Sequence, residues 1–207
     1  MLIGIIIGST RKPRAAPQIA QFVLDTIENS ETYQKQSAKP TLRLIDLAHW
    51  NLPLYDESKV PSQIKSTEEY DHEHTRRWSR EVQKYDAFIF VTPQYNWGYP
   101  AVLKNAIDFL YNEWHGKPAM VVTYGEHGGT KCNEQLTLVL QGIRMLPTDS
   151  TVTLAFPDRK TLVDAATGAD LGLSNSSVES FWEGEKSQIE KAYANLLQIY
   201  SRAVQPS

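Results

Sequence analysis

The stretch LIGIIIGSTRKPR at residues 2–14 is a short apolar run that passes into a polar, basic turn. Its aliphatic start predicts a buried strand, and the glycine and serine that follow mark a turn. A helix is predicted next, because apolar residues recur there at helical spacing (Ile19, Phe22, Val23 and Ile27). A strand, a turn and a helix in this order are typical of a parallel α/β sheet.

Four more apolar runs predict further strands, at residues 42–45, 87–92, 119–123 and 151–156. Segments with helical spacing separate most of these runs. One helix is predicted from Pro100, which suits a first turn, to Gly116, which suits a helix end. Parallel strands with continuous apolar runs need helices on both faces. The sequence therefore predicts one α/β domain over residues 1–207, a three-layer sandwich around a five-stranded parallel sheet.

Two segments do not follow this alternation. Residues 47–84 are long for a single crossover, although they regain helical spacing near their end. Residues 157–180 are polar and rich in Gly, Ser, Asp and Thr, which predicts a surface loop or a partly disordered insertion. Helical spacing returns over residues 181–203, where we expect a C-terminal helix.

The composition excludes several classes of partner. A formal charge of −3 without a dense basic run gives no reason to expect nucleic-acid binding. No stretch approaches the ~20 apolar residues of a membrane helix, so we expect a soluble protein. Cys132 is the only cysteine, which excludes an intramolecular disulfide and favours a reducing compartment such as the cytoplasm.

The turn after the first strand is a candidate phosphate site. It precedes a helix, whose first amides and partial positive charge attract anions at the carboxyl edge of a parallel sheet. Ser9 adds a hydroxyl donor, and Arg11 and Arg14 can neutralise a dianion. With a single glycine the turn matches neither a dinucleotide fingerprint nor a Walker A loop, so a mononucleotide phosphate fits better. A solvated basic loop that caps a helix is an equally good interpretation of this turn alone.

A second candidate loop follows the central strand and precedes the helix near Pro100. It offers amide and aromatic side chains: Pro93, Gln94, Tyr95, Asn96 and Trp97. Such a loop meets the needs of a flavin ring, because backbone amides can stabilise the charge that reduction places near N1 and the C2 carbonyl. An aromatic turn at a subunit contact is the alternative.

A third candidate loop follows the fourth strand: Tyr124, Gly125, Glu126, His127, Gly128 and Gly129. Its glycines would let the backbone approach a flat ligand, and its place beside two other strand ends suits one mononucleotide pocket. In isolation, a plain glycine-rich turn is the stronger interpretation.

No metal site is expected. His72 and His74 are flanked by acidic residues, but ligands two positions apart point in different directions on a helix.

At these three loops the sequence resembles the NAD(P)H-dependent FMN reductase family, and within it the fungal NAD(P)H:FMN quinone reductases. Four stretches carry the resemblance: GSTRKPR at 8–14, TPQYNWGYPAVLKNAID at 92–108, EWHGKP at 113–118 and the glycine loop at 125–129. It runs in order from Met1 to about Met145 and gives nothing specific beyond Pro157. Glu126 departs from the GGxGG pattern usual in the family, which bears on the shape of the loop and on the choice of nicotinamide.

The resemblance implies a flavodoxin-like fold with strand order 2-1-3-4-5 and FMN as the cofactor. It implies that Ser9, Arg11 and Arg14 hold the FMN phosphate, that residues 93–97 line the ring, and that residues 124–129 close its other side. It also implies a homodimer with the flavin near the subunit boundary, where Tyr95, Trp97 or His127 would meet the partner.

The implied activity is a ping-pong reaction. NADPH or NADH reduces FMN, and a quinone, free flavin or similar acceptor then takes the electrons on the same face. No side chain need act as an acid, base or nucleophile. Two alternatives stay open: a flavodoxin-like electron carrier, and an FMN-binding redox sensor that regulates a protein partner.

Overall fold

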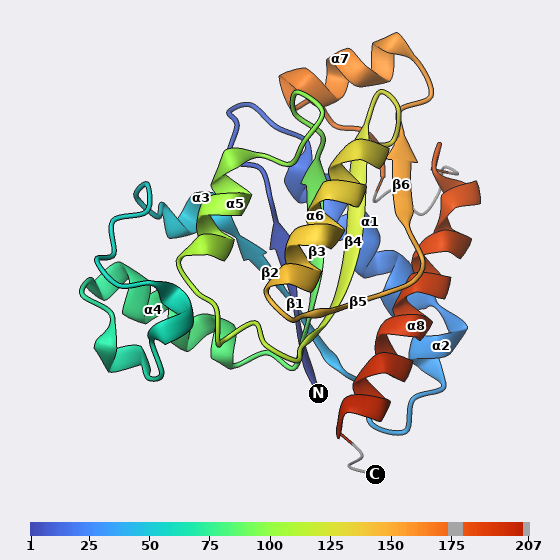
Figure 1. Cartoon of the computed structure of the whole chain (residues 1–207). Coiled ribbons are helices and arrows are strands. Elements are labelled where there is room, and N and C mark those ends of the chain that lie inside the picture. The colour runs from blue at the N-terminus through green and yellow to red at the C-terminus, as the bar shows by residue number, and fades with distance from the viewer. Residues whose placement is uncertain (174–179, 205–207) are drawn as a thin grey trace.

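The computed structural model describes residues 1–173 and 180–204, and its centre is a parallel sheet (Figure 1). The strands are β1 (Leu2–Ile7), β2 (Thr41–Asp46), β3 (Ala87–Pro93), β4 (Pro118–Gly125), β5 (Leu146–Pro147) and β6 (Val152–Ala155). Their order is β2-β1-β3-β4-β5, and β6 also pairs with β4. This order is that of the flavodoxin-like doubly wound sheet, so the fold predicted from the resemblance is confirmed.

Two short strands share the edge position beside β4, where the sequence predicts one. β5 pairs with the start of β4, through Pro118 opposite Leu146, and β6 pairs with its end, from Val122 opposite Val152. The predicted strand at 151–156 corresponds to β6, and the run at 146–147 is too short to be recognised from its pattern.

Helices cover both faces of the sheet (Figure 1). Buried residues of α1 (Ala16–Asn29) and α8 (Lys186–Val204) pack on one face, and those of α4 (Glu73–Gln83), α5 (Ala101–Asp108) and α6 (Thr130–Gly142) pack on the other. Short helical turns complete the chain: α2 (Glu31–Gln34), α3 (Leu47–Trp50), Pro61–Gln63, Thr67–Glu69 and Glu183–Glu185. The apolar spacing of the first helix is confirmed, since Ile19, Phe22, Val23 and Ile27 are all buried.

Two boundary predictions are wrong. The helix expected to reach Gly116 ends at Asp108, because the chain turns there to bury Phe109, Leu110 and Trp114 against the sheet. Within 157–180, expected to be a loop or insertion, residues Arg159–Thr167 form helix α7, which begins after the Asp158 cap. Residues 174–179 of that stretch lie outside the described part of the chain. Within the described residues, no helix is long and apolar enough to cross a bilayer.

Candidate functional site

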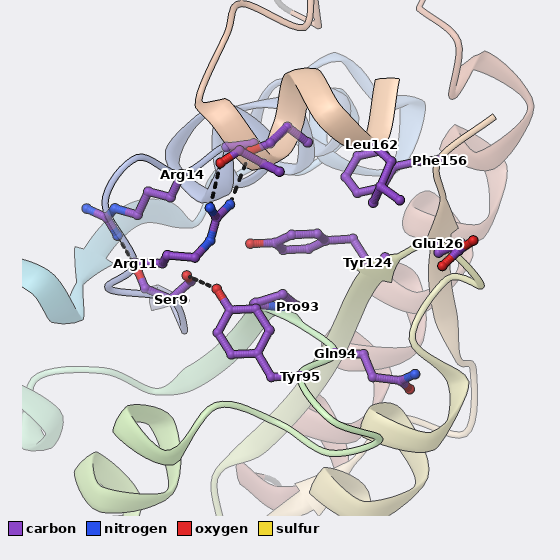
Figure 2. A pocket seen from close by; sticks show the side chains of 14 residues that line it. Ser9, Arg11, Arg14, Pro93, Gln94, Tyr95, Tyr124, Glu126, Phe156 and Leu162 are labelled. Carbon is purple, nitrogen blue, oxygen red and sulfur yellow. Dashed lines mark hydrogen bonds between the residues drawn. The ribbon is translucent and has the colours of Figure 1, made fainter. Parts of the chain in front are cut away.

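A cavity of about 250 Å³ lies at the carboxyl edge of the sheet, where the loops after β1, β3 and β4 meet (Figure 2). The register brings these ends together, since Ile7 pairs with Val91 and Pro93 pairs with Tyr124. The predicted residues among its lining are Ser9, Arg11, Arg14, Pro93, Gln94, Tyr95, Tyr124, Gly125 and Glu126. The three predicted loops therefore converge on one cavity. The other predicted residues do not line it: Asn96, Trp97, His127, Gly128 and Gly129.

Ser9 joins the first loop to the second. Its side chain is buried, and its Oγ lies 2.9 Å from the hydroxyl oxygen of Tyr95 (Figure 2). Gln94 joins the second loop to α6, because its Oε1 accepts a hydrogen bond from the amide of Cys132 at 3.1 Å. These two contacts tie the second loop to the first loop and to α6.

Arg14 is paired with a carboxylate that sequence reasoning did not select. Its guanidinium contacts both oxygens of Asp46, with Nη1 2.9 Å from Oδ1 and Nη2 2.6 Å from Oδ2, and it also donates to the carbonyl of Ser9. Burial disfavours the charged carboxyl, but the hydrogen bonds from Arg14 and from the Ala48 amide lower the pKa of Asp46. Asp46 therefore compensates the charge of Arg14. The position of Asp46 at the end of β2 was the signal that could have revealed it.

Arg11 has no carboxylate partner among its hydrogen bonds in the described structure. Its Nη1 donates to the carbonyl of Ala166 at 2.5 Å, and its Nη2 donates to that of Ala165 at 3.3 Å. Both acceptors lie in the last turn of α7 (Figure 2). The positive charge of Arg14 is therefore balanced by a carboxylate, whereas none of these hydrogen bonds pairs Arg11 with a carboxylate.

The second loop turns tightly at Asn96 and Trp97. Tyr95 and Gly98 exchange backbone hydrogen bonds of 2.8 and 2.9 Å, and the two residues between them have φ of 47° and 69°. A left-handed backbone is unusual for a tryptophan. The turn directs the chain away from the cavity and leaves the Trp97 side chain 67% exposed.

In the third loop, glycines shape the backbone. Gly128 and Gly129 have φ of 72° and 83°, and a Cβ on Gly129 would lie 2.9 Å from the Cβ of Thr123. The loop can therefore close onto the end of β4 only with glycines at these positions. Tyr124 projects into the cavity beside Arg11, and burial raises its pKa, helped by the neighbouring Tyr95, so that it stays a neutral phenol (Figure 2).

Sequence reasoning missed one whole wall of the cavity. Besides Ala15, this wall consists of residues from β6 onward: Phe156, Leu162, Ala165 and Ala166. The last three belong to α7, whose polar composition hid it. The residues that could have revealed α7 in the sequence are its caps. Asp158 accepts a hydrogen bond from the Thr161 amide at 2.7 Å, and Gly168 ends the helix with φ of 71°.

The two histidines do not point apart as expected. His72 precedes α4 with an extended backbone, and its ring stacks on that of His74 with centroids 5.1 Å apart. Both contact Asp56: His74 Nε2 lies 2.9 Å from Oδ1, and His72 Nε2 lies 3.2 Å from the carbonyl oxygen. The expectation is wrong because His72 caps the helix and does not lie within it.

The fold and this cavity define a doubly wound α/β protein with its ligand site at the carboxyl edge of the sheet. The chain belongs to the NADPH-dependent FMN reductase family, whose model matches residues 1–157. The protein is accordingly an oxidoreductase with FMN as its cofactor and NADPH or NADH as its reductant.

Fungal and bacterial proteins are similar to this chain in sequence or in fold. The NAD(P)H-dependent FMN reductase LOT6 of Saccharomyces cerevisiae is 57% identical over 147 residues, which cover 70% of this chain and 76% of LOT6. The NAD(P)H-dependent FMN reductase ntnL of a Nectria species is 34% identical over 93% of this chain and 87% of its own. The flavoenzyme FerB of Paracoccus denitrificans, an NAD(P)H:(acceptor) oxidoreductase, has the same fold, with a TM-score of 0.66, 20% identity and coverage of 95% and 97%.

The donor set of the cavity fits FMN. A hydroxyl (Ser9) and a guanidinium (Arg11) lie at one end, as a phosphate requires, and the phenol of Tyr124 lies beside them. Apolar and aromatic surfaces (Pro93, Tyr95 and Phe156) form other parts of the lining.

Proposed function

We propose that this protein transfers a hydride from NADPH or NADH, through FMN held in the cavity, to a quinone, free flavin or similar acceptor. The observation that carries this proposal is the convergence of the loops after β1, β3 and β4 on one cavity that has cationic, hydroxyl and apolar lining. Bound FMN supplies the hydride chemistry at its N5 atom. The printed names of the fungal relatives and of FerB support NAD(P)H as reductant and leave the acceptor open.

The proposed contacts follow the three loops. Ser9 and Arg11 hold the phosphate, and Arg14 orients the loop through its bonds to Asp46 and to the Ser9 carbonyl. Residues 93–95 line the ring from one side, and residues 124–126 do so from the other. The remaining residues of the two loops act by shaping them or by reaching the cavity from a partner subunit: Asn96, Trp97, His127, Gly128 and Gly129.

No protein nucleophile takes part in the proposed reaction. Cys132, whose amide donates to Gln94 of the second loop, has a buried thiol, and burial raises its pKa to about 12. It therefore stays protonated at neutral pH. Its Sγ lies 3.5 Å from the carbonyl of Pro93, which is the contact of a packing residue.

We propose a ping-pong order for the two substrates, because both would react at the same bound FMN. The apolar and aromatic lining beside the proposed FMN site forms one opening that nicotinamide and acceptor would share. The two substrates are therefore expected to use one opening in turn.

Anaerobic mixing tests the activity. The purified protein, loaded with FMN and mixed with NADPH or NADH, is expected to lose its flavin absorbance within seconds and to regain it when benzoquinone is added. Steady-state rates over both substrates should give parallel double-reciprocal lines. Intersecting lines would contradict the ping-pong order, and protein that leaves added FMN free in solution would contradict the whole proposal.

We further propose a homodimer whose interface includes the loop after β3. Tyr95, which lines the cavity, is 37% exposed, and Trp97 on the same turn is 67% exposed. Aromatic side chains are enriched at subunit contacts. Because Trp97 adopts a left-handed backbone that costs energy while its large side chain stays exposed, a partner surface would account for a tryptophan at this position.

Trp97→Gly tests the contribution of Trp97 to the dimer interface without destabilising the turn. Glycine tolerates φ of 69° better than tryptophan, so the turn itself should not be weakened. Truncating a tryptophan at the centre of an interface costs about 2 kcal/mol, which corresponds to a roughly 30-fold weaker dimer. Sedimentation equilibrium measures this change, with Leu138→Ala, an equally exposed side chain on α6, as the control. A wild-type protein that is monomeric at every concentration would refute the dimer.

A further inference from the structure

Helix α7 (Arg159–Thr167) forms a wall of the cavity, yet it begins just beyond residue 157, where the match to the family model ends. Leu162, Ala165 and Ala166 reach the cavity from this helix. Figure 2 shows it lying across the site above Arg11 and Tyr124. One wall of the pocket therefore comes from outside the segment that the family model matches.

Arg11, the proposed phosphate ligand, also holds the carboxyl end of α7. Arg11 donates to the carbonyls of Ala165 and Ala166 in the last turn of the helix, and the Ala165 carbonyl also accepts from the Gly168 amide at 3.4 Å. A cation at this end is also favoured by the helix dipole. A phosphate that binds through the same Nη1 and Nη2 donors would compete with these carbonyls.

Close packing locks the same end onto the β1–α1 loop. Gly168, which ends α7, sits so near this loop that a Cβ there would lie 2.9 Å from the Cβ of Pro13 and 3.2 Å from the amide nitrogen of Arg14. The next residues are tied to α1, since Gln18 Nε2 donates to the carbonyl of Ala169 and its Oε1 accepts from the Leu171 amide, both at 2.9 Å.

We propose that α7 is a gate that Arg11 latches shut in the absence of cofactor, and that FMN binds after the end of α7 has lifted away from the β1–α1 loop. Arg11 and the packing of Gly168 hold the end of α7 against the β1–α1 loop, so this end must move before Arg11 can turn both Nη atoms to a phosphate. Only the open fraction of the protein is competent, so the apparent affinity is reduced by that fraction. This inference rests on FMN binding in this cavity, as proposed above.

Gly168→Ala tests the gate without altering any residue that lines the cavity. The new methyl group cannot fit against Pro13, so α7 should undock and the rate constant of FMN association should rise about five- to tenfold. The dissociation rate constant should stay within twofold. Both are measured by stopped-flow quenching of flavin fluorescence on the cofactor-free protein.

The matched control is Gly172→Ala. Gly172 has a similar φ of 66°, but a Cβ there would meet nothing within 4 Å, so this change adds the same backbone strain without a clash. It should leave the association rate within twofold of wild type. If Gly168→Ala folds poorly, Gln18→Ala removes both tethers to the segment after α7 and should raise the association rate in the same direction.

Hydrogen exchange gives an independent readout. Because the coupling is reciprocal, FMN binding should speed exchange of the amides in the last turn of α7. Equal FMN association rates in Gly168→Ala and Gly172→Ala would contradict the gate. So would a Gly168→Ala protein in which only the FMN dissociation rate rises. Neither result would contradict the proposed function. Failure of every variant and of the wild type to bind FMN would overturn both.

Discussion

Arg11→Ala is expected to weaken FMN binding through a faster dissociation. One charge-assisted contact to phosphate contributes about 1.5–3 kcal/mol, which corresponds to a roughly 10- to 150-fold change in the dissociation rate constant. Arg11 is the cation with the largest expected effect, because Asp46 pairs with Arg14 and no carboxylate pairs with Arg11 in the described structure. The association rate should not fall, since the same substitution removes the latch on α7.

Stopped-flow association and displacement experiments separate these two effects. Lys12→Ala is the matched control, because Lys12 is an exposed cation in the same loop that does not line the cavity. A general charge effect would slow association in both variants and leave dissociation unchanged in both. Wild-type dissociation in Arg11→Ala would place the phosphate elsewhere.

The carboxyl edge of the sheet was predictable because each strand there carries its own signal. An apolar run that ends in Gly8 or in Pro93 predicts both a buried strand and the turn that follows it. Strand order 2-1-3-4-5 then brings these turns together. What the pattern did not contain was the partner of each side chain: Asp46 for Arg14, and the carbonyls of α7 for Arg11. Main-chain acceptors leave no trace in a sequence.

Helix α7 escaped prediction because its burial is slight. Ala165 is the buried residue of its nine, so its apolar periodicity is weak and its composition resembles that of a loop. Caps at Asp158 and Gly168 define it better than its interior does. A helix that covers a cavity needs few apolar contacts, so its sequence is under little constraint of the kind that periodicity detects.

The motif EWHGKP at 113–118 shows the opposite case, in which a family stretch lies far from the site. It ends where β4 begins, at the amino edge of the sheet, with Trp114 in the core. The carboxylate of Glu113 is buried there and accepts hydrogen bonds from Ser79 Oγ at 2.6 Å and from the Tyr70 hydroxyl at 2.9 Å. A resemblance in sequence therefore marks what holds the sheet as well as what binds the cofactor.

Lys117 in this motif is expected to make the stability of the protein depend on alkaline pH. Its Nζ donates to the carbonyl of Val82 at 2.8 Å and lies 5.6 Å from the ring centroid of Phe88. Burial lowers the pKa of Lys117 to about 8, although Asp86 and Glu113 favour its charged form. The unfolded chain keeps this amine protonated to its ordinary pKa of about 10.4.

The direction in which the free energy of unfolding changes with pH follows from proton binding. Below pH 8 Lys117 is protonated in both the folded and the unfolded state, and the folded state is destabilised by the buried cation. Between pH 8 and about 10.4 the unfolded state binds the extra proton, so the free energy of unfolding rises with pH. We expect a gain of about 2 kcal/mol between pH 7 and pH 10 in wild type relative to Lys117→Met, since each pKa unit is worth about 1.4 kcal/mol.

Urea unfolding at the two pH values measures this gain, and the difference between the two proteins cancels the titration of other groups. Lys131→Met removes an exposed lysine on α6 and serves as the matched control, for which the difference from wild type should change little with pH. A Lys117→Met protein that follows the wild type at both pH values would mean that Lys117 keeps its charge in the fold. The contact with Val82 would then be that of an ammonium group stabilised by Asp86 and Glu113.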